Sequence, residues 1–341
     1  MQETIPISLP RYRLALTPTP VEPLPNLSST FGVDLSVKRD DLTGLAFGGN
    51  KIRQLEYYFG EAKTQGATLV LITGAVQSNY VRATAAVAAR AGMRFHAQLE
   101  ERVQGMETES YRKSGNILLN LLYDAKISHY PDGDDEAGAD AALRDIAADY
   151  RRQGETPYII PLTPDSPSLG SVGYLHAAEE LLSQCPSADH FVLASGSGQT
   201  QAGLLFGLRM LGSDARVTGI CVRRAADEQR KRVASHCRGL AGILRVESPV
   251  SSADIVVDDI ALGSYGRAEA HVLNAIELAA RSDGLILDPV YTGKAFAGLL
   301  ALLGDGTVAR GDNVVFIHTG GTPALFAYGP EILKHLQHEH Q

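Results

Sequence analysis

The sequence predicts an α/β protein with two domains, each an open, mostly parallel sheet flanked by helices. Short apolar runs alternate with amphipathic stretches along nearly the whole chain, a rhythm typical of parallel sheets covered by helices. The 341 residues suffice for two ordinary domains, and a hydrophobic content of 44% can fill their cores. In chain order, buried strands are expected at 68–73, 94–99, 157–161, 191–194, 217–222, 285–287 and 314–317, with helices at 78–91, 115–122, 140–152, 198–211, 269–280 and 292–303.

Composition excludes several classes of protein. The net charge is −8 and no lysine and arginine block forms a stripe, so a nucleic-acid partner is not expected. No apolar run approaches the length of a membrane span, and residues 1–25 do not read as a secretory signal. The three cysteines are far apart and include no Cys-x-x-Cys pair, so neither a disulfide framework nor a metal site is expected. These features favour a cytoplasmic protein that acts on a small molecule.

Lys51 stands out because two glycines precede it and a helical pattern follows it. The segment Gly48-Gly49-Asn50-Lys51 allows a close backbone approach and then fixes the amine at a helix start. A lysine that is held and partly desolvated can attack a carbonyl group. Taken alone, the pattern favours a solvated lysine in the first turn of a helix, and the other motifs of the chain change that interpretation.

A second loop has the composition of a phosphate site. The strand 191–194 ends in Ser195-Gly196-Ser197-Gly198-Gln199-Thr200 and runs directly into a helix. Backbone amides, hydroxyls and the positive end of a helix together bind a phosphate dianion, although small residues at such a turn can also serve packing alone. A dinucleotide site is disfavoured, because Gln201 replaces the third glycine and Arg223 and Arg224 follow the next strand.

Further polar loops leave other expected strands, where the ligands of parallel sheets usually bind. Gln77-Ser78-Asn79-Tyr80 can bind a substrate carboxylate, and Ser78 and Asn79 equally fit a helix cap. Two late loops contain Tyr291 and Thr319-Gly320-Gly321, and Tyr265 lies in a separate glycine-flanked turn. The stretch 161–167, with its three prolines, is expected to be both a domain crossing and an active-site loop.

Together these motifs resemble the pyridoxal phosphate enzymes of fold type II, the tryptophan synthase β superfamily. The resemblance is narrower to the group of D-cysteine desulfhydrase, L-cysteate sulfo-lyase and 1-aminocyclopropane-1-carboxylate deaminase, and it runs from about Pro18 to Tyr328. It rests on Lys38-Arg39-Asp40-Asp41, Gly48-Gly49-Asn50-Lys51, Gln77-Ser78-Asn79, Asp288-Pro289-Val290-Tyr291 and Thr319-Gly320-Gly321.

The resemblance implies a role for each matching position. Lys51 matches the lysine that holds the cofactor covalently, and Asn79 matches the asparagine at its phenolic oxygen. Ser78 matches the serine that faces the substrate, while Tyr291 and Tyr265 match two active-site tyrosines. The remaining cofactor contacts are expected from Asn50, Gly196, Ser197, Gly198, Gln199, Thr200 and Thr319, and substrate contacts from Gln77, Ser78, Asn79, Tyr80, Thr163, Thr292 and Thr322.

Two positions bear on the reaction. The deaminase is expected to have glutamate and leucine where Thr292 and Thr322 stand, so opening of a cyclopropane ring is disfavoured. A neutral threonine stabilises a protonated pyridine ring poorly, which favours prompt β-elimination. Departures at 162–167 and at Tyr80 change the expected side-chain pocket, and Asp165 would oppose an anionic sulfonate if it pointed inward.

The resemblance thus predicts a pyridoxal phosphate lyase in which a large cofactor-binding domain, 1–53 and 165–341, faces a small domain, 54–164, across a cleft that holds the cofactor. The expected reaction converts D-cysteine to pyruvate, sulfide and ammonia. The alternatives are L-cysteate or another β-substituted amino acid as substrate, the cyclopropane substrate, and a catalytically silent pyridoxal phosphate-binding protein. A homodimer is expected from the family.

Overall fold

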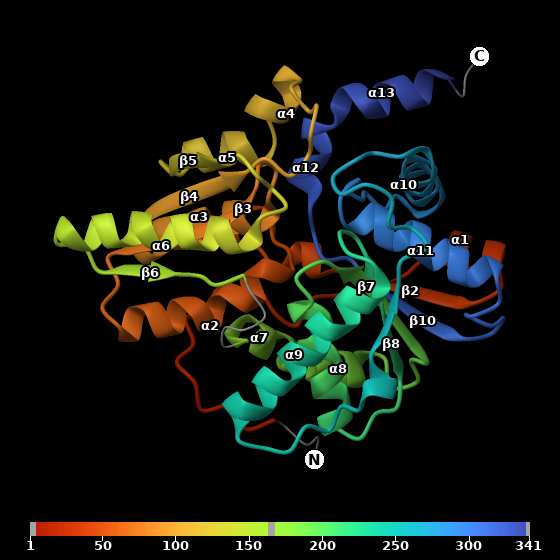
Figure 1. Cartoon of the computed structure of the whole chain (residues 1–341). Helices are drawn as coiled ribbons and strands as arrows, with labels where there is room; N and C mark the ends of the chain where they lie inside the picture. Colours follow the sequence, from red (N-terminus) through yellow and green to blue (C-terminus); the bar gives the residue numbers. More distant parts are fainter. Residues whose placement is uncertain (1–4, 163–167, 339–341) are drawn as a thin grey trace.

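The strands form two separate sheets in the computed structural model of the chain (Figure 1). The structure describes residues 5–162 and 168–338. The larger sheet has six strands in the order β1-β2-β10-β7-β8-β9, and the smaller has four in the order β5-β4-β3-β6. Their bounds are β1 Val21–Pro23, β2 Asp34–Lys38, β3 Leu69–Ala75, β4 Arg94–Glu100, β5 Lys126–Tyr130, β6 Pro157–Ile159, β7 His190–Ser195, β8 Arg216–Cys221, β9 Val256–Asp258 and β10 Asn313–Ile317.

The larger sheet is parallel except for its edge strand β1, which runs antiparallel to β2. Every residue of the central strand β7 is buried, because helices cover both faces of the sheet. Six helices surround this sheet: α1 Pro25–Phe31, α7 Leu169–Gln184, α8 Gln199–Met210, α9 Ala226–Leu244, α10 Ala270–Asp283 and α11 Thr292–Gly304.

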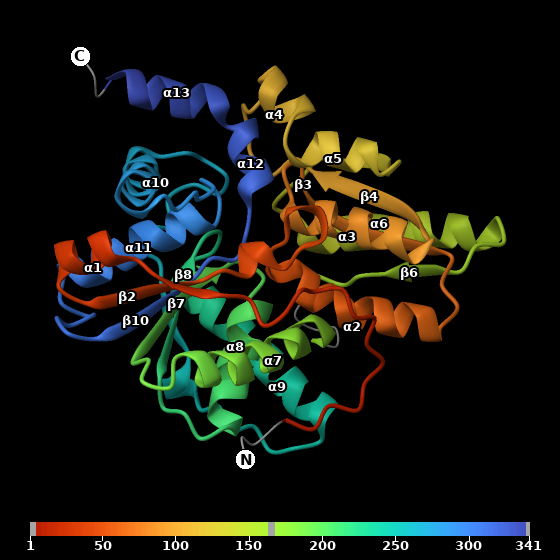
Figure 2. The same ribbon diagram turned by 180° about the vertical axis from the view of Figure 1, so that it is seen from behind.

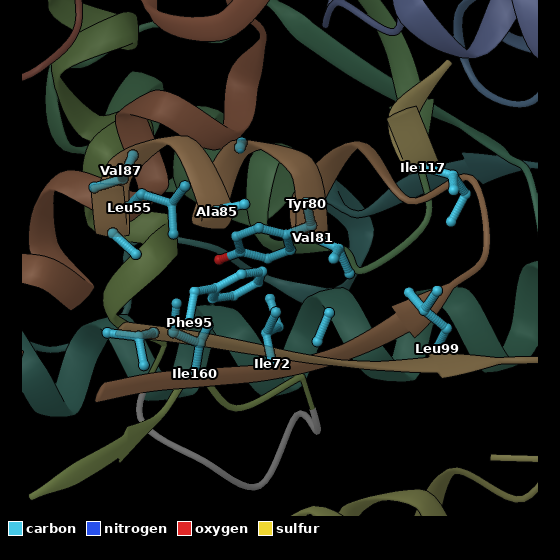
Figure 3. Close-up of a cluster of buried hydrophobic side chains, with 14 of the residues drawn as sticks. Leu55, Ile72, Tyr80, Val81, Ala85, Val87, Phe95, Leu99, Ile117 and Ile160 are labelled. Atoms are coloured by element: carbon cyan, nitrogen blue, oxygen red, sulfur yellow. The ribbon is translucent and has the colours of Figure 1, made fainter. Parts of the chain in front are cut away.

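The smaller sheet is entirely parallel, and its central strand β3 is buried along its whole length. Tyr80 and Phe95 lie together in the hydrophobic core between this sheet and its helices, beside Ile72 and Leu55 (Figure 3). The surrounding helices are α2 Asn50–Thr64, α3 Asn79–Ala91, α4 Glu109–Lys113, α5 Asn116–Leu122 and α6 Glu136–Arg152.

Helix α2 lies between the two sheets and packs on α7 of the larger one (Figure 2). Strands β3 to β6 form the smaller sheet and the other strands form the larger one, while the boundary expected at 53 falls inside α2. The division into a large domain of 1–53 and 165–341 and a small domain of 54–164 stays a prediction. The C-terminal helices α12, Thr322–Ala327, and α13, Gly329–His338, return over both units. Ser110 of α4 donates to the carbonyl oxygen of Phe326 at 2.9 Å. None of the helices within the described residues is both long and apolar enough to cross a bilayer.

The expected strand at 285–287 is wrong. Leu285 and Leu287 are buried, as an apolar run should be, but their backbone pairs with no neighbouring strand. The amide of Leu285 donates to Ala279 at the end of α10, and the carbonyl oxygen of Ile286 accepts from His318 Nε2 at 2.8 Å. A side chain and a helix end therefore satisfy polar groups that a sheet would otherwise satisfy.

Candidate active site

A pocket of about 100 Å³ opens between the two sheets, where the carboxyl ends of β3, β7 and β10 meet the first turns of α2, α3 and α8. Because ligands of parallel sheets bind at these strand ends, the pocket is the candidate site. Of the residues expected from the sequence, the structure brings together Asn50, Lys51, Ser78, Asn79, Tyr80, Gly196, Ser197, Gly198, Thr200, Tyr265, Tyr291 and Thr319.

The backbone before Lys51 has a conformation that requires glycine. Gly48 and Gly49 have φ values of 59° and 110°. A Cβ at Gly48 would lie 2.1 Å from the carbonyl oxygen of Asp41, and one at Gly49 would lie 3.1 Å from that of Thr319. The amide of Asn50 donates to the same Thr319 oxygen at 3.0 Å. The glycines thus let the start of α2 dock against the loop after β10, which places Lys51 in the pocket.

The amine of Lys51 has little to neutralise it. Its nearest polar partner is Gln54 Oε1 at 3.5 Å, and the ring centroid of Tyr80 lies 4.8 Å away. It forms no ion pair with any residue in the described part of the chain. Burial lowers the pKa of Lys51 to about 8. A lysine in this state supplies a neutral, nucleophilic amine near physiological pH.

The loop after β7 presents an uncapped helix start to the pocket. Gly198 is the N-cap of α8, with φ of 84°, and offers no side-chain cap to the free amides of the first turn. Thr200 Oγ1 accepts from Asn50 Nδ2 at 2.8 Å and from Gln54 Nε2 at 2.9 Å. The amides and the positive end of α8 form a site for a phosphate group, as the sequence predicts.

Three side chains that the sequence did not point to hold this loop from behind. His236 Nε2 donates to the carbonyl oxygen of Ser197 at 2.9 Å, and Arg232 Nε donates to the same oxygen at 3.1 Å. Arg224 donates to the carbonyl oxygen of Gly196 at 3.3 Å. Donors on the carbonyl side leave the loop's amides free for a ligand. No sequence signal marks His236, because α9 reaches the loop only through the tertiary fold.

The tautomer of His236 follows from its partners. A carbonyl oxygen can only accept, so Nε2 carries the hydrogen, and Nδ1 accepts from the hydroxyl of Ser168 at 2.8 Å. His236 is buried, and burial lowers its pKa to about 4. The ring is therefore neutral at physiological pH and acts as a fixed donor.

Ser78 and Asn79 lie at the start of α3. Ser78 Oγ accepts from the amide of Val81 at 3.2 Å, so the capping role expected for this serine is present while its side chain also lines the pocket. Asn79 Oδ1 accepts from Asn116 Nδ2 at 2.9 Å, which orients the amide group of Asn79. Ser78, Asn79 and Tyr80 all line the pocket, so the positive end of α3 lies at the pocket wall, where it can bind a carboxylate.

The two expected tyrosines form a pair. The hydroxyl oxygens of Tyr265 and Tyr291 lie 2.8 Å apart, and the rings meet edge to face with centroids 6.4 Å apart. Burial raises the pKa of Tyr291 well above its usual range, and the neighbouring Tyr265 raises it further. Tyr291 therefore keeps its proton at neutral pH and can act as a hydrogen-bond donor.

Several expected site residues are not brought to the pocket. Gln77 donates to the carbonyl oxygens of Tyr111 at 2.6 Å and Ser114 at 3.0 Å, a structural role. The side chain of Gln199 points toward Tyr58, with 3.3 Å between Nε2 and the hydroxyl, so only its backbone remains at the phosphate loop. Thr292 is buried and hydrogen-bonded to Asp288, and Thr322 begins α12, so neither residue lines the pocket. Thr163 lies outside the described residues.

Tyr80 contributes its ring rather than its hydroxyl. The ring lies under the amine of Lys51, while the hydroxyl is buried without a hydrogen-bond partner within the described residues. Burial raises the pKa of Tyr80 well above its usual range. This side chain belongs to the core shown in Figure 3, so it forms an apolar wall of the pocket.

The described residues contain no group of three or more His, Cys, Asp or Glu side chains placed to hold a metal ion.

A family model for "Pyridoxal-phosphate dependent enzyme" matches residues 12–320. The chain belongs to this family.

Named relatives of this pyridoxal-phosphate dependent enzyme narrow the comparison. The chain is 41% identical to a D-cysteine desulfhydrase of Salmonella choleraesuis (strain SC-B67) over 327 residues, which is 95% of this chain and 97% of the relative. It is 40% identical to a D-cysteine desulfhydrase of Salmonella typhi over the same shares. These relatives confirm the resemblance drawn from the motifs.

Solved structures agree with the fold. A crystal structure described as an "ACC deaminase homologue" matches with a TM-score of 0.87 and 36% identity, covering 96% of this chain and 97% of its own. A fungal L-serine ammonia-lyase from Rhizomucor miehei matches with a TM-score of 0.68 at 17% identity, which shows the fold alone. The expected fold class, two parallel sheets flanked by helices as in fold type II enzymes, is confirmed.

The pocket of this family member fits pyridoxal phosphate. The unpaired amine of Lys51 suits the aldehyde group, and the uncapped start of α8 suits the phosphate. A Cβ at Gly196 would lie 3.2 Å from Val222 and 3.4 Å from the ring of Tyr291, so this part of the phosphate loop packs closely against both side chains. The expected cofactor is confirmed by the family and by the relatives.

Proposed function

We propose that the protein is a lyase that cleaves the carbon–sulfur bond of D-cysteine and, with one water molecule, gives pyruvate, hydrogen sulfide and ammonia. The 41% identity to D-cysteine desulfhydrases across 95% of the chain supports the substrate. The observation that carries the reaction type is the Lys51 amine, which has no carboxylate partner and shares its pocket with the phosphate loop. The bound cofactor supplies the carbonyl group and the electron-withdrawing ring that this chemistry needs.

Lys51 has two tasks in this proposal. Its neutral amine holds the cofactor at rest, because a pKa of about 8 leaves about a tenth of the amine deprotonated at pH 7, far more than the ordinary value of 10.5 would leave. With the cofactor and substrate bound, an unattached Lys51 amine would lie in the pocket with Gln54 as its weak partner among the described residues, and would be placed to accept the α-proton. Ser78, which lines the same pocket, is the alternative base.

The start of α3 binds the substrate carboxylate in this proposal. Ser78, Asn79 and Tyr80 at this helix start line the pocket, and Asn79 is oriented by the 2.9 Å bond from Asn116. A carboxylate at this helix start is stabilised by the helix dipole, by roughly 0.3–1 kcal/mol. Ser78 is already bonded to Val81, which fixes its hydroxyl group beside that carboxylate.

The tyrosine pair assists the leaving group. Tyr291 keeps its proton because burial raises its pKa, and the 2.8 Å contact with Tyr265 makes a chain of two hydroxyl groups. Such a chain can donate a hydrogen bond to the departing sulfur, which stabilises the negative charge that develops on the sulfur.

The test is release of sulfide and pyruvate from a panel of amino acids by the purified, cofactor-loaded protein. D-cysteine is expected to give both products. Less oxoacid is expected from L-cysteine, which would give pyruvate with sulfide, from L-cysteate, which would give pyruvate with sulfite, and from 1-aminocyclopropane-1-carboxylate, which would give 2-oxobutyrate. The Lys51→Ala variant should lose at least a thousandfold in kcat, since it removes both the attachment point and the base. Lys63→Ala is the matched control, because Lys63 lies in the last turn of the same helix and only contacts the ring of Tyr12.

Four outcomes contradict the proposal. Full sulfide release by Lys51→Ala would remove the assigned base. Silence toward D-cysteine would reject the substrate, and an oxoacid released from the cyclopropane amino acid alone would favour a deaminase. A protein that binds the cofactor but turns over no member of the panel would be the silent binder. A homodimer and a cytoplasmic location stay predictions, to be checked by sedimentation and by cell fractionation.

A further inference from the structure

Three arginines of the larger sheet unit converge on one carboxylate of the smaller unit at the edge of the pocket. Arg223 and Arg224 follow β8, Arg232 lies in α9, and Glu136 is the first residue of α6. Nitrogen–oxygen distances to Glu136 are 2.7 Å from Arg223 and 3.3 Å from Arg232, and Arg224 pairs with the same carboxylate. All four side chains line the pocket. We call Arg223, Arg224 and Arg232 the arginine cluster.

The positive charge of the arginine cluster is not balanced. Three cations face one carboxylate, so two positive charges remain. The side chains of Arg223, Arg224 and Arg232 are only 12%, 15% and 10% exposed, so water screens them weakly. Burial lowers the pKa of Arg224 to about 10 and also lowers that of Arg232.

Other charged groups nearby do not remove this excess. Arg102 also lines the pocket, but Glu100 pairs with it at 2.7 Å. Asp134 and Glu228 line the adjoining outer cavity, and neither forms an ion pair with the arginine cluster in the described part of the chain. The arginine cluster therefore attracts an additional anion.

We propose that the arginine cluster is a binding site for a small dianionic oxyanion, such as sulfate or inorganic phosphate, and that Glu136 holds the place of this ligand. Guanidinium groups match the geometry of tetrahedral oxyanions through paired N–H donors. Replacing the carboxylate by a dianion lowers the uncompensated charge from two to one.

Glu136 can leave the arginine cluster without disturbing the core. Its side chain is 30% exposed and also borders the outer cavity, which gives it room to turn away. Its backbone stays at the first position of α6, where a negative side chain remains favourable in either orientation.

A bound oxyanion has a consequence for the pocket. Arg224 and Arg232 also donate to the carbonyl oxygens of Gly196 and Ser197, so the oxyanion lies beside the phosphate loop and narrows the entrance. Because the oxyanion takes the place of Glu136, it also breaks the ion pairs that Glu136 forms between the smaller and the larger unit. The bound oxyanion should therefore inhibit the enzyme in competition with the amino-acid substrate. This inhibition rests on the proposed lyase function, whereas the binding of the oxyanion does not.

Isothermal titration of the cofactor-loaded protein with sodium sulfate tests the binding, with sodium chloride at equal ionic strength as reference. The loaded protein is used because the cofactor then fills the phosphate loop, and any sulfate site that remains lies elsewhere. One saturable sulfate site per chain is expected. Glu136→Gln should bind sulfate about tenfold more tightly, since it removes the competing charge, and Arg223→Gln about tenfold more weakly.

Arg267→Gln is the matched control. Arg267 borders the outer cavity and donates to the carbonyl oxygen of Gln104, so its loss removes one nearby positive charge outside the arginine cluster. Its sulfate affinity should stay within about twofold of the parent. If Arg223→Gln fails to fold, Arg223→Lys keeps the charge, loses the paired donors, and should still weaken sulfate binding.

Two results overturn the proposal. One is the absence of saturable sulfate binding in both the parent protein and Glu136→Gln. The other is equal weakening in Arg223→Gln and Arg267→Gln, which would mean that sulfate responds only to the overall potential. A protein that binds sulfate as expected but does not act on D-cysteine would reject the proposed substrate and leave the oxyanion site standing.

Discussion

The state of Lys51 leads to a prediction for the rate at which the cofactor-free protein binds pyridoxal phosphate. With a pKa of about 8, half of the Lys51 amines are neutral at pH 8. An amine at the ordinary value of 10.5 would be only about 0.3% neutral at that pH, so burial raises the reactive fraction about 150-fold. The association rate should rise about tenfold per pH unit below 8 and level off above it.

Stopped-flow absorbance between pH 6 and pH 10 measures this profile. Borohydride reduction followed by peptide mass mapping should locate the attachment at Lys51. Lys294 is the internal comparison, because burial also lowers its pKa to about 8, yet its amine donates to the carbonyl oxygens of Leu262 at 2.5 Å and Ser264 at 2.7 Å. A rate that continues to climb to pH 10, or attachment at Lys294, would refute the reasoning.

The residues around the pocket lead to four further predictions. His236→Ala should weaken cofactor binding about tenfold in an absorbance titration, and His236→Gln less, because glutamine can still donate to Ser197; equal losses would contradict this. The pKa of His236 is about 4 in the folded protein, so the unfolded chain binds more protons between about pH 4 and 6.5. The free energy of unfolding should therefore fall as pH drops through this window. The fall should be smaller in His236→Gln by up to about 3 kcal/mol, and denaturant unfolding measures the difference. Tyr265→Phe should lower kcat about tenfold with unchanged cofactor affinity, and a loss of affinity instead would assign Tyr265 to cofactor binding. Gly49→Ala should cost about 1–3 kcal/mol of stability because φ is 110° there, and a neutral result in thermal unfolding would contradict the close docking on Thr319.

The parts of the site that sequence could predict are those built within one loop. Gly48 and Gly49 precede Lys51, and further glycines interrupt the turn after a buried strand. The local sequence therefore determines the backbone conformation of each loop and the residue at which its helix begins. The alternation of apolar runs and amphipathic stretches predicted most of the central strands for the same reason. Strands β1, β2, β5 and β9 were missed because they are short or half-polar and gain their ladder only from neighbours far along the chain.

The parts that sequence could not predict depend on distant elements. His236 supports the phosphate loop from α9, 39 residues further along the chain, and Glu136 reaches the arginine cluster from the other unit. Thr292 differs in the opposite way, since the resemblance implies a substrate contact for it, whereas its hydroxyl donates to Asp288 Oδ1 at 2.7 Å. A residue next to a site in sequence can point away from it, because adjacent residues at a helix start face different directions.

Helix α2 shows how the fold tolerates an unpaired amine at its start. Arg53, two residues after Lys51, is 2% exposed and pairs with Asp40 at 2.9 Å and Glu180 at 2.7 Å. Residues two apart on a helix face different sides, so Arg53 anchors α2 to the larger unit while Lys51 faces the pocket. Removing one partner of such a buried pair costs about 3–5 kcal/mol, which indicates how firmly this anchor holds. The two cations of this helix thus differ in their surroundings, because Arg53 is paired with two carboxylates, whereas Lys51 has no carboxylate partner among the described residues.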